Sequence, residues 1–314
     1  MEPRHPNRRA WIIVGISFAA VVALVVGFLV WQSGSGDSGV PSADEGVDRT
    51  VGLLTEKDPV CDDWIRYADE LAERTKEWSE IDKTISAANW SSEQRLIAED
   101  AADAMSTAAD QFESILPMAA NVVLRELIAQ SIVFSRAFVE RMPEYEYADA
   151  MLAGVAGNFG TATTFMCTAM PIVLARKLTG ESSISSTDNP ARLTPFLADE
   201  REGCDTLVAL LDRQNSVLRG WASGDPSVPA SKWTAEDRKL NEAAIPVLEE
   251  DAKQARLIAD KAENSVLSDL LHTYASYLLA FAQALPSYEP DDDQLWKVVI
   301  SLGGGLGAAC EARL

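Results

Sequence analysis

The sequence predicts an all-α fold in which one N-terminal transmembrane helix precedes two tandem, duplicated four-helix bundle units, each stapled by a disulfide. Three observations lead to this prediction. The run of 21 residues at 11–31 contains no charged side chain. The four cysteines form two pairs with the same spacing of 106 positions. Tryptophan, proline and glycine residues that follow Cys61 recur at the same distances after Cys204.

Residues 11–31 form the predicted transmembrane helix, because about 20 apolar residues are enough to cross a bilayer. Arg4, Arg8 and Arg9 precede this run, whereas residues 32–48 contain no Lys or Arg. The positive-inside rule therefore predicts a cytoplasmic tail at 1–10 and a single-pass protein of the plasma membrane whose remainder is extracytoplasmic. Small residues after the run leave its cleavage as a signal peptide open. We expect residues 32–49, which contain many Gly and Ser, to be a flexible linker.

The charge balance argues against nucleic acid as a partner. The formal net charge is −21, and residues 1–10 carry +2, so the rest of the chain carries −23. Nucleic acids and anionic lipid headgroups are bound by basic surfaces, which this part of the chain does not offer. The same acidity also fits an exported domain that only needs to stay soluble, and the composition does not separate this from an acidic face used for a partner.

The two units are an internal duplication with an offset of 143 positions, the distance from Cys61 to Cys204. The register holds from the first to the last cysteine of each unit without a gap. Such a repeat is best identified before any single element is assigned. We therefore assign residues 50–172 to the first unit, 173–192 to a polar linker and 193–314 to the second unit. Matching positions include Trp78 and Trp221, Trp90 and Trp233, Arg95 and Arg238, Glu99 and Glu242, Pro143 and Pro286, Tyr145 and Tyr288, and Gly160 and Gly303.

Each unit is expected to contain four helices. The first starts at Cys61, where apolar residues recur every three or four positions. The second starts after the capping-box pair Ser91 and Gln94, which Thr234 and Asp237 repeat in the second unit. The third ends before the proline of each unit. The fourth is expected at 149–167 and 292–310, where several glycines favour a close helix contact, although the triple glycine at 303–305 could instead interrupt the helix.

The cysteines are expected to pair within each unit. An even number of cysteines in an exported protein indicates disulfides. In an up-down-up-down bundle, the start of the first helix and the end of the fourth lie at the same end. Cys61 with Cys167 and Cys204 with Cys310 occupy these positions. Each bond would close a loop of about 100 residues, for which the loop-entropy model gives a stabilisation of roughly 4.7 kcal/mol.

The residues offer no recognisable catalytic constellation, so we expect a non-enzymatic protein without a cofactor or metal. The chain has two histidines, and His272 has Ala129 as its counterpart in the first unit. No Cys or His cluster has the spacing of a transition-metal site. The glycines at 303–307 lack the strand-to-helix context of a phosphate-binding loop.

Two duplicated groups of residues could be either structural or part of an interaction site. The first places a tryptophan before the second helix and an Arg and a Glu on it. We favour a structural role, with the tryptophan packed over the helix start and the arginine stacked on it. The second is the acidic corner at 143–149 and 286–292, for which helix capping is favoured over calcium binding. The tryptophan, arginine and glutamate set consists of Trp90, Arg95, Glu99, Trp233, Arg238 and Glu242.

In layout, the chain resembles actinobacterial, mycobacterial-like, single-pass, membrane-anchored exported helical proteins of unknown function. The resemblance rests on MEPRHPNRR before the apolar run and two Cys-bounded helical units after it. It implies a place in the cell envelope and no particular activity.

The leading functional hypothesis is a membrane-tethered, extracytoplasmic interaction or scaffold module of the cell envelope. The membrane would be contacted through residues 11–31, and the partner would be an envelope protein. The alternative is a carrier or sensor that binds a lipid or another apolar ligand between the helices of a bundle.

Overall fold

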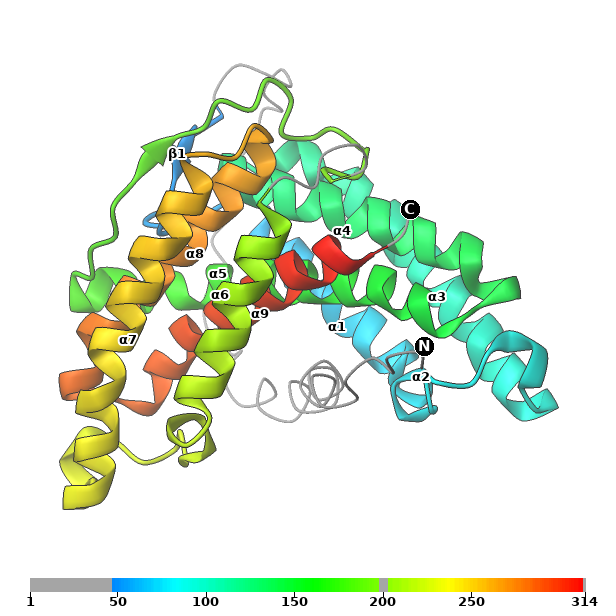
Figure 1. Ribbon diagram of the computed structural model, residues 1–314. Helices are drawn as coiled ribbons and strands as arrows, with labels where there is room; N and C mark the ends of the chain where they lie inside the picture. Colours follow the sequence, from blue (N-terminus) through cyan, green and yellow to red (C-terminus); the bar gives the residue numbers. More distant parts are fainter. Residues whose placement is uncertain (1–46, 198–202, 313–314) are drawn as a thin grey trace, which may run out of the picture.

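The computed structural model describes residues 47–197 and 203–312, and most of this part is helical (Figure 1). The first unit contains α1 (Cys61–Arg74), α2 (Lys76–Glu80), α3 (Ser92–Ile115), α4 (Val122–Arg141) and α5 (Ala150–Arg176). The second contains α6 (Cys204–Leu218), α7 (Ala235–Ala259), α8 (Ser265–Ala284) and α9 (Asp293–Glu311). Two short strands, β1 (Thr50–Val51) and β2 (Ser183–Ile184), pair antiparallel between the units.

The helix starts repeat the offset found in the sequence. Helices α6, α7, α8 and α9 begin 143 positions after α1, α3, α4 and α5, respectively. Both sequence-predicted capping boxes are present, with Ser91 and Gln94 at the start of α3 and Thr234 and Asp237 at the start of α7. Asn121 and Asn264 cap α4 and α8 in the same way, by accepting backbone N–H groups of the first turn. These polar side chains satisfy orphan N–H groups and so fix where each helix begins.

The two units share one hydrophobic core. Their last helices, α5 and α9, pack along each other more extensively than any other pair of elements. Figure 1 shows the rest of the first unit on the right and of the second on the left. The triple glycine does not interrupt α9, which is continuous through it. Instead, a Cβ atom at Gly305 would lie 2.4 Å from the ring of buried Phe159, and one at Gly304 would lie 2.7 Å from Asn158. The glycines therefore permit the close approach of α9 to α5.

Replacing Gly305 with alanine tests this contact. Alanine is the better helix former by about 1 kcal/mol, but its methyl group would collide with the Phe159 ring. Overpacking of this kind usually costs about 1–3 kcal/mol, so we expect a net loss in the free energy of unfolding, measured with urea. Gly220→Ala is the control, because no atom lies within 4 Å of its Cβ position. Equal stability of both variants would contradict a tight contact at Gly305.

The segment predicted as a linker, 173–192, is structured for much of its length. Helix α5 continues nine residues past Cys167 to Arg176, which forms an ion pair with Asp292 of the second unit at 2.8 Å. Further along, the backbone of β2 pairs with β1, and the Ser276 hydroxyl donates to the carbonyl of Glu181. Composition alone predicted a polar linker, because the segment contains turn residues and has no apolar period. Its hydrogen bonds to distant parts of the chain hold it in place.

The structure corrects the prediction of a single-pass membrane protein with one transmembrane helix. Within residues 47–197 and 203–312, no helix combines the length and the apolar character that a membrane span requires. The long helices instead carry polar residues among their apolar ones and direct the apolar side chains toward the shared core. The run 11–31, on which the prediction rested, lies outside the described residues, as do 1–10 and most of 32–49. The supported fold class is a helical body with two disulfides.

Candidate functional site

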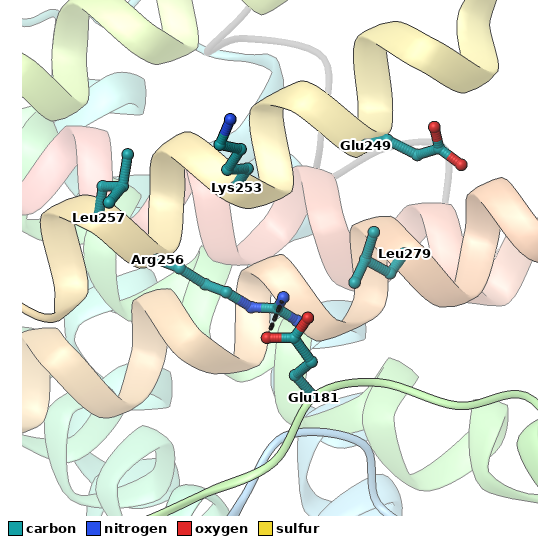
Figure 2. A pocket seen from close by; sticks show the side chains of 6 residues that line it. All are labelled: Glu181, Glu249, Lys253, Arg256, Leu257 and Leu279. Atoms are coloured by element: carbon teal, nitrogen blue, oxygen red, sulfur yellow. Dashed lines mark ion pairs between the residues drawn. The ribbon is translucent and has the colours of Figure 1, made fainter.

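A pocket of about 340 Å³ opens at the surface of the second unit, between α7, α8 and the connector that follows α5 (Figure 2). Helix α7 supplies most of its wall, and Leu279 of α8 supplies an apolar side. Glu181 reaches into the pocket from the connector. The lining thus combines acidic, basic and apolar side chains, namely Glu181, Glu249, Lys253, Arg256, Leu257 and Leu279.

Arg256 is the least exposed charged side chain of the pocket. Its side chain is only 15% exposed and lies with its guanidinium against the carboxylate of Glu181, at 2.5 Å between Nη1 and Oε2. The Nε and Nη2 atoms are buried and have no hydrogen-bond acceptor. Glu181 itself remains 75% exposed. A guanidinium presents its donors in a fixed fork, so a carboxylate that displaced the exposed Glu181 could bind Arg256 in a bidentate arrangement.

The same place in the first unit has the opposite charges. The counterparts of Lys253, Arg256 and Leu279 are Asp110, Glu113 and Arg136. Arg136 of α4 bridges both acids of α3, at 2.8 Å from Asp110 and 2.5 Å from Glu113. The first unit therefore neutralises these charges between its own helices. In the second unit, α7 carries bases in place of these acids, and α8 provides a leucine instead of a counter-charge.

Leu257 adds an exposed apolar surface beside Arg256. It is 44% exposed, whereas its counterpart in the first unit is Ser114. Leu279, across the pocket, is partly buried. A ligand that suits these walls has a carboxylate next to an apolar group, because the first would meet Arg256 and the second the two leucines.

Of the residues proposed from the sequence, the four cysteines form the expected bonds. Cys61 is joined to Cys167 and Cys204 to Cys310, and the part of the chain that the structure describes contains no free cysteine. Each bond ties the first helix of a unit to its fourth. These residues lie in the frame of the fold and do not line the pocket.

The duplicated tryptophans hold the loop before the second helix of each unit. Trp90 stacks on Tyr145 at 5.5 Å, and Trp233 stacks on Tyr288 at 5.8 Å. Both tyrosine hydroxyls donate to carbonyl groups of the same loops, those of Lys83 and Pro226. We interpret the tryptophans as parts of a structural clamp between this loop and the end of the third long helix.

The charged members of the duplicated set lie in two different environments. Arg95 donates to the carbonyl of Ala87, and Arg238 donates to that of Ala230, each bond fastening the clamp loop to the helix. Among the described residues, the ion pairs do not include Arg95 with Glu99 or Arg238 with Glu242. Both glutamates are exposed. The set is thus split, with tryptophan and arginine in the clamp and glutamate on the surface.

Comparison with known proteins places the chain in a family. The family described as mycobacterial ESX-1 associated protein matches residues 40–314. The chain belongs to this family. It is also 27% identical over 334 aligned positions to an uncharacterized protein of Mycolicibacterium smegmatis (strain MKD8), covering 99% of this chain and 88% of that protein. No solved structure matches the chain. The mycobacterial character of the layout is thereby shown, and the membrane anchor is not.

In this member of the family, the acidic corners cap helices. Glu146 with Asp149 and Glu289 with Asp292 form reciprocal capping boxes before α5 and α9. Burial raises the pKa of Asp292, and Arg176 opposes that rise. Within the residues that the structure describes, no three His, Cys, Asp or Glu side chains are grouped closely enough to hold a metal ion.

Sequence reasoning about this member of the family missed the Arg256 pocket. A signal was available, because aligning the two units shows acids at 110 and 113 replaced by bases at 253 and 256. Identities between the units define the repeat but pass over such positions. Reversals of charge at matched positions reveal where one unit has acquired a different surface.

Proposed function

We propose that the chain is a non-enzymatic interaction module that acts with the ESX-1 secretion system and binds a protein partner in the Arg256 pocket. The family name supports the choice of system. The single observation that supports this site is the charge reversal between the units. It places an arginine with unused donors in the second unit, where the first unit has Glu113. Both disulfides support action outside the cytoplasm, where such bonds persist.

The partner segment that fits the pocket carries an acidic side chain next to an apolar one. Its carboxylate would displace that of Glu181 and bind two donors of the Arg256 guanidinium. Glu181 is largely exposed, so its ion pair contributes at most about 1 kcal/mol and can be displaced. Leu257 and Leu279 would cover the apolar side chain.

The test is site-specific crosslinking in a mycobacterial host. A photoreactive residue replaces Leu257 in the full chain, and captured proteins are identified by mass spectrometry. We expect capture of an ESX-1 component. Arg256→Glu should lower that capture at least about tenfold, because a bidentate charge-assisted contact becomes a repulsion. Glu181→Gln should raise it several-fold by freeing Arg256.

Arg141→Glu is the matched control, with the same charge change on an exposed residue of the first unit. Capture that is equally weakened by Arg141→Glu, or unaffected by Arg256→Glu, would reject the pocket as the partner site. A lipid acid in place of a protein in the crosslinked product would favour the carrier function instead.

A further inference from the structure

Two buried carboxyl groups face each other where the units meet. Glu126 of α4 is 0% exposed and Asp269 of α8 is 3% exposed. They are counterparts, separated by the offset of 143 positions. The same position of each unit therefore meets its counterpart here, where α4 contacts α8, and both units place an acid there.

The connector crosses directly over this pair. The Ser185 hydroxyl donates to Asp269, and the Thr187 hydroxyl lies 2.7 Å from Oε1 of Glu126 and 3.1 Å from Oδ2 of Asp269. Arg49 holds the connector from its outer side, because its Nη2 donates to the carbonyls of Ser185 and Thr187 at 2.8 Å each. We call residues 183–187 the strap.

The hydrogen-bond donors around the two carboxyl groups are too few to satisfy both, so the pair needs one additional proton. The Thr187 hydroxyl has a single hydrogen and can serve only one of the two carboxyl groups. Oε2 of Glu126 is buried and receives no N–H or O–H donor. Glu126 is in hydrogen-bond contact with Asp269. A proton on Glu126 would let its carboxyl group donate to Asp269. Two carboxylates in a buried site would otherwise repel each other.

The electrostatic surroundings agree with this proton count. Burial, followed by the nearby charge of Asp269, raises the pKa of Glu126 well above its ordinary value. Arg49, on the β1 side, is the cation that opposes the rise, and the strap adds the hydroxyl of Thr187. The groups facing Glu126 are thus one acid from α8, one base beside β1 and the polar side chains of the strap.

We propose that the proton shared by Glu126 and Asp269 latches the strap over the junction of the two units, and that its loss releases the strap. The release moves residues that lie two to six positions after Glu181 in the chain. Glu181 would then leave Arg256, so the latch would control access to the pocket, a consequence that rests on the proposed function.

The direction of the pH dependence follows from the raised pKa. Between the ordinary pKa of 4.5 and the higher folded value, the folded chain holds a proton that the unfolded chain lacks. This contribution to stability is fully present below about pH 4.5 and is lost as the pH rises through the folded pKa. The strap is therefore closed at acidic pH and opens toward alkaline pH.

Hydrogen exchange of the strap amides in the full chain tests the latch. Wild type and Glu126→Gln are compared at the same pH, from about pH 5 to about pH 9, so that intrinsic exchange rates cancel. Glutamine keeps the shape and can still donate to Asp269, but it cannot lose the proton. We expect strap exchange in the wild type to exceed that of Glu126→Gln by at least about tenfold at the alkaline end and to match it at the acidic end.

Glu140→Gln, an exposed change on the same helix, should behave as wild type. Asp269→Asn gives a second route to the same result and keeps the test open if Glu126→Gln does not fold. Identical exchange in the wild type and in every folded variant of the pair at every pH would overturn the proposal. Pocket capture at Leu257 is measured separately, so a strap that responds to pH without any change in capture supports the latch and counts only against its control of the pocket.

Discussion

Replacing Cys61 and Cys167 together with serine should lower the free energy of unfolding by about 4–5 kcal/mol. The disulfide closes a loop with a sequence separation of 106 residues, and the entropy that it removes from the unfolded chain grows with loop length. Urea unfolding of the oxidised protein and of the variant gives the difference directly. For a protein of this size the melting temperature should fall by on the order of 10 °C.

The second disulfide provides the internal comparison. Cys204 and Cys310 have the same separation of 106 residues, so the loop-entropy argument gives the same loss for their replacement. Because the units share a core, either variant is expected to unfold in one transition. Two separate transitions in either variant would show that the units are energetically independent, contrary to the packing of α5 on α9.

Trp90→Ala should cost about 3–5 kcal/mol, a magnitude typical of removing a buried aromatic side chain. The indole is 8% exposed, stacks on Tyr145 and meets the edge of Trp78 at 5.9 Å. Its removal would leave a cavity under the clamp loop, which the neighbouring rings cannot fill. The free energy of unfolding in urea measures the loss.

Trp233→Ala in the second unit is the matched comparison. Trp233 also stacks on a tyrosine, Tyr288, but it is only partly buried. We therefore expect a smaller loss in the free energy of unfolding, on the order of 2 kcal/mol. A larger loss at Trp233 than at Trp90 would mean that burial does not set the cost in this clamp. If both variants unfold as wild type but capture of the partner fails, the tryptophans form part of the binding surface instead.

Local features of the sequence predicted much of the fold. Ser91 and Thr234 each precede a capping partner by three positions, and both boxes lie where expected. A cap depends on a few adjacent residues, so its pattern is readable without knowing the rest of the structure. The cysteine pairing was equally accessible, because the repeat gave two equal spacings and the bundle placed both ends of each unit together.

Contacts between the units were much harder to predict. Gly305 needs to be small because of Phe159, which lies 146 positions away in the sequence and in the other unit. Nothing near the glycines indicates which helix approaches them, so close packing and helix interruption both remained open. The strap is a similar case, since Ser185 and Thr187 read as linker residues until Glu126 and Asp269 are brought beneath them.

The junction of the two units resembles that of a symmetric dimer, because matching helices of the two units meet there, α5 with α9 and α4 with α8. In an isologous interface, each surface meets its own copy across a twofold axis, and a residue on that axis meets itself. Glu126 and Asp269 are such a self-matched pair, contributed here by one polypeptide. A chain with one unit would expose half of this junction and would need a second chain to cover it, so its folding would depend on protein concentration. Joining the units in one chain removes that dependence and leaves each half free to acquire a separate outer surface, as the opposite charges at Glu113 and Arg256 illustrate.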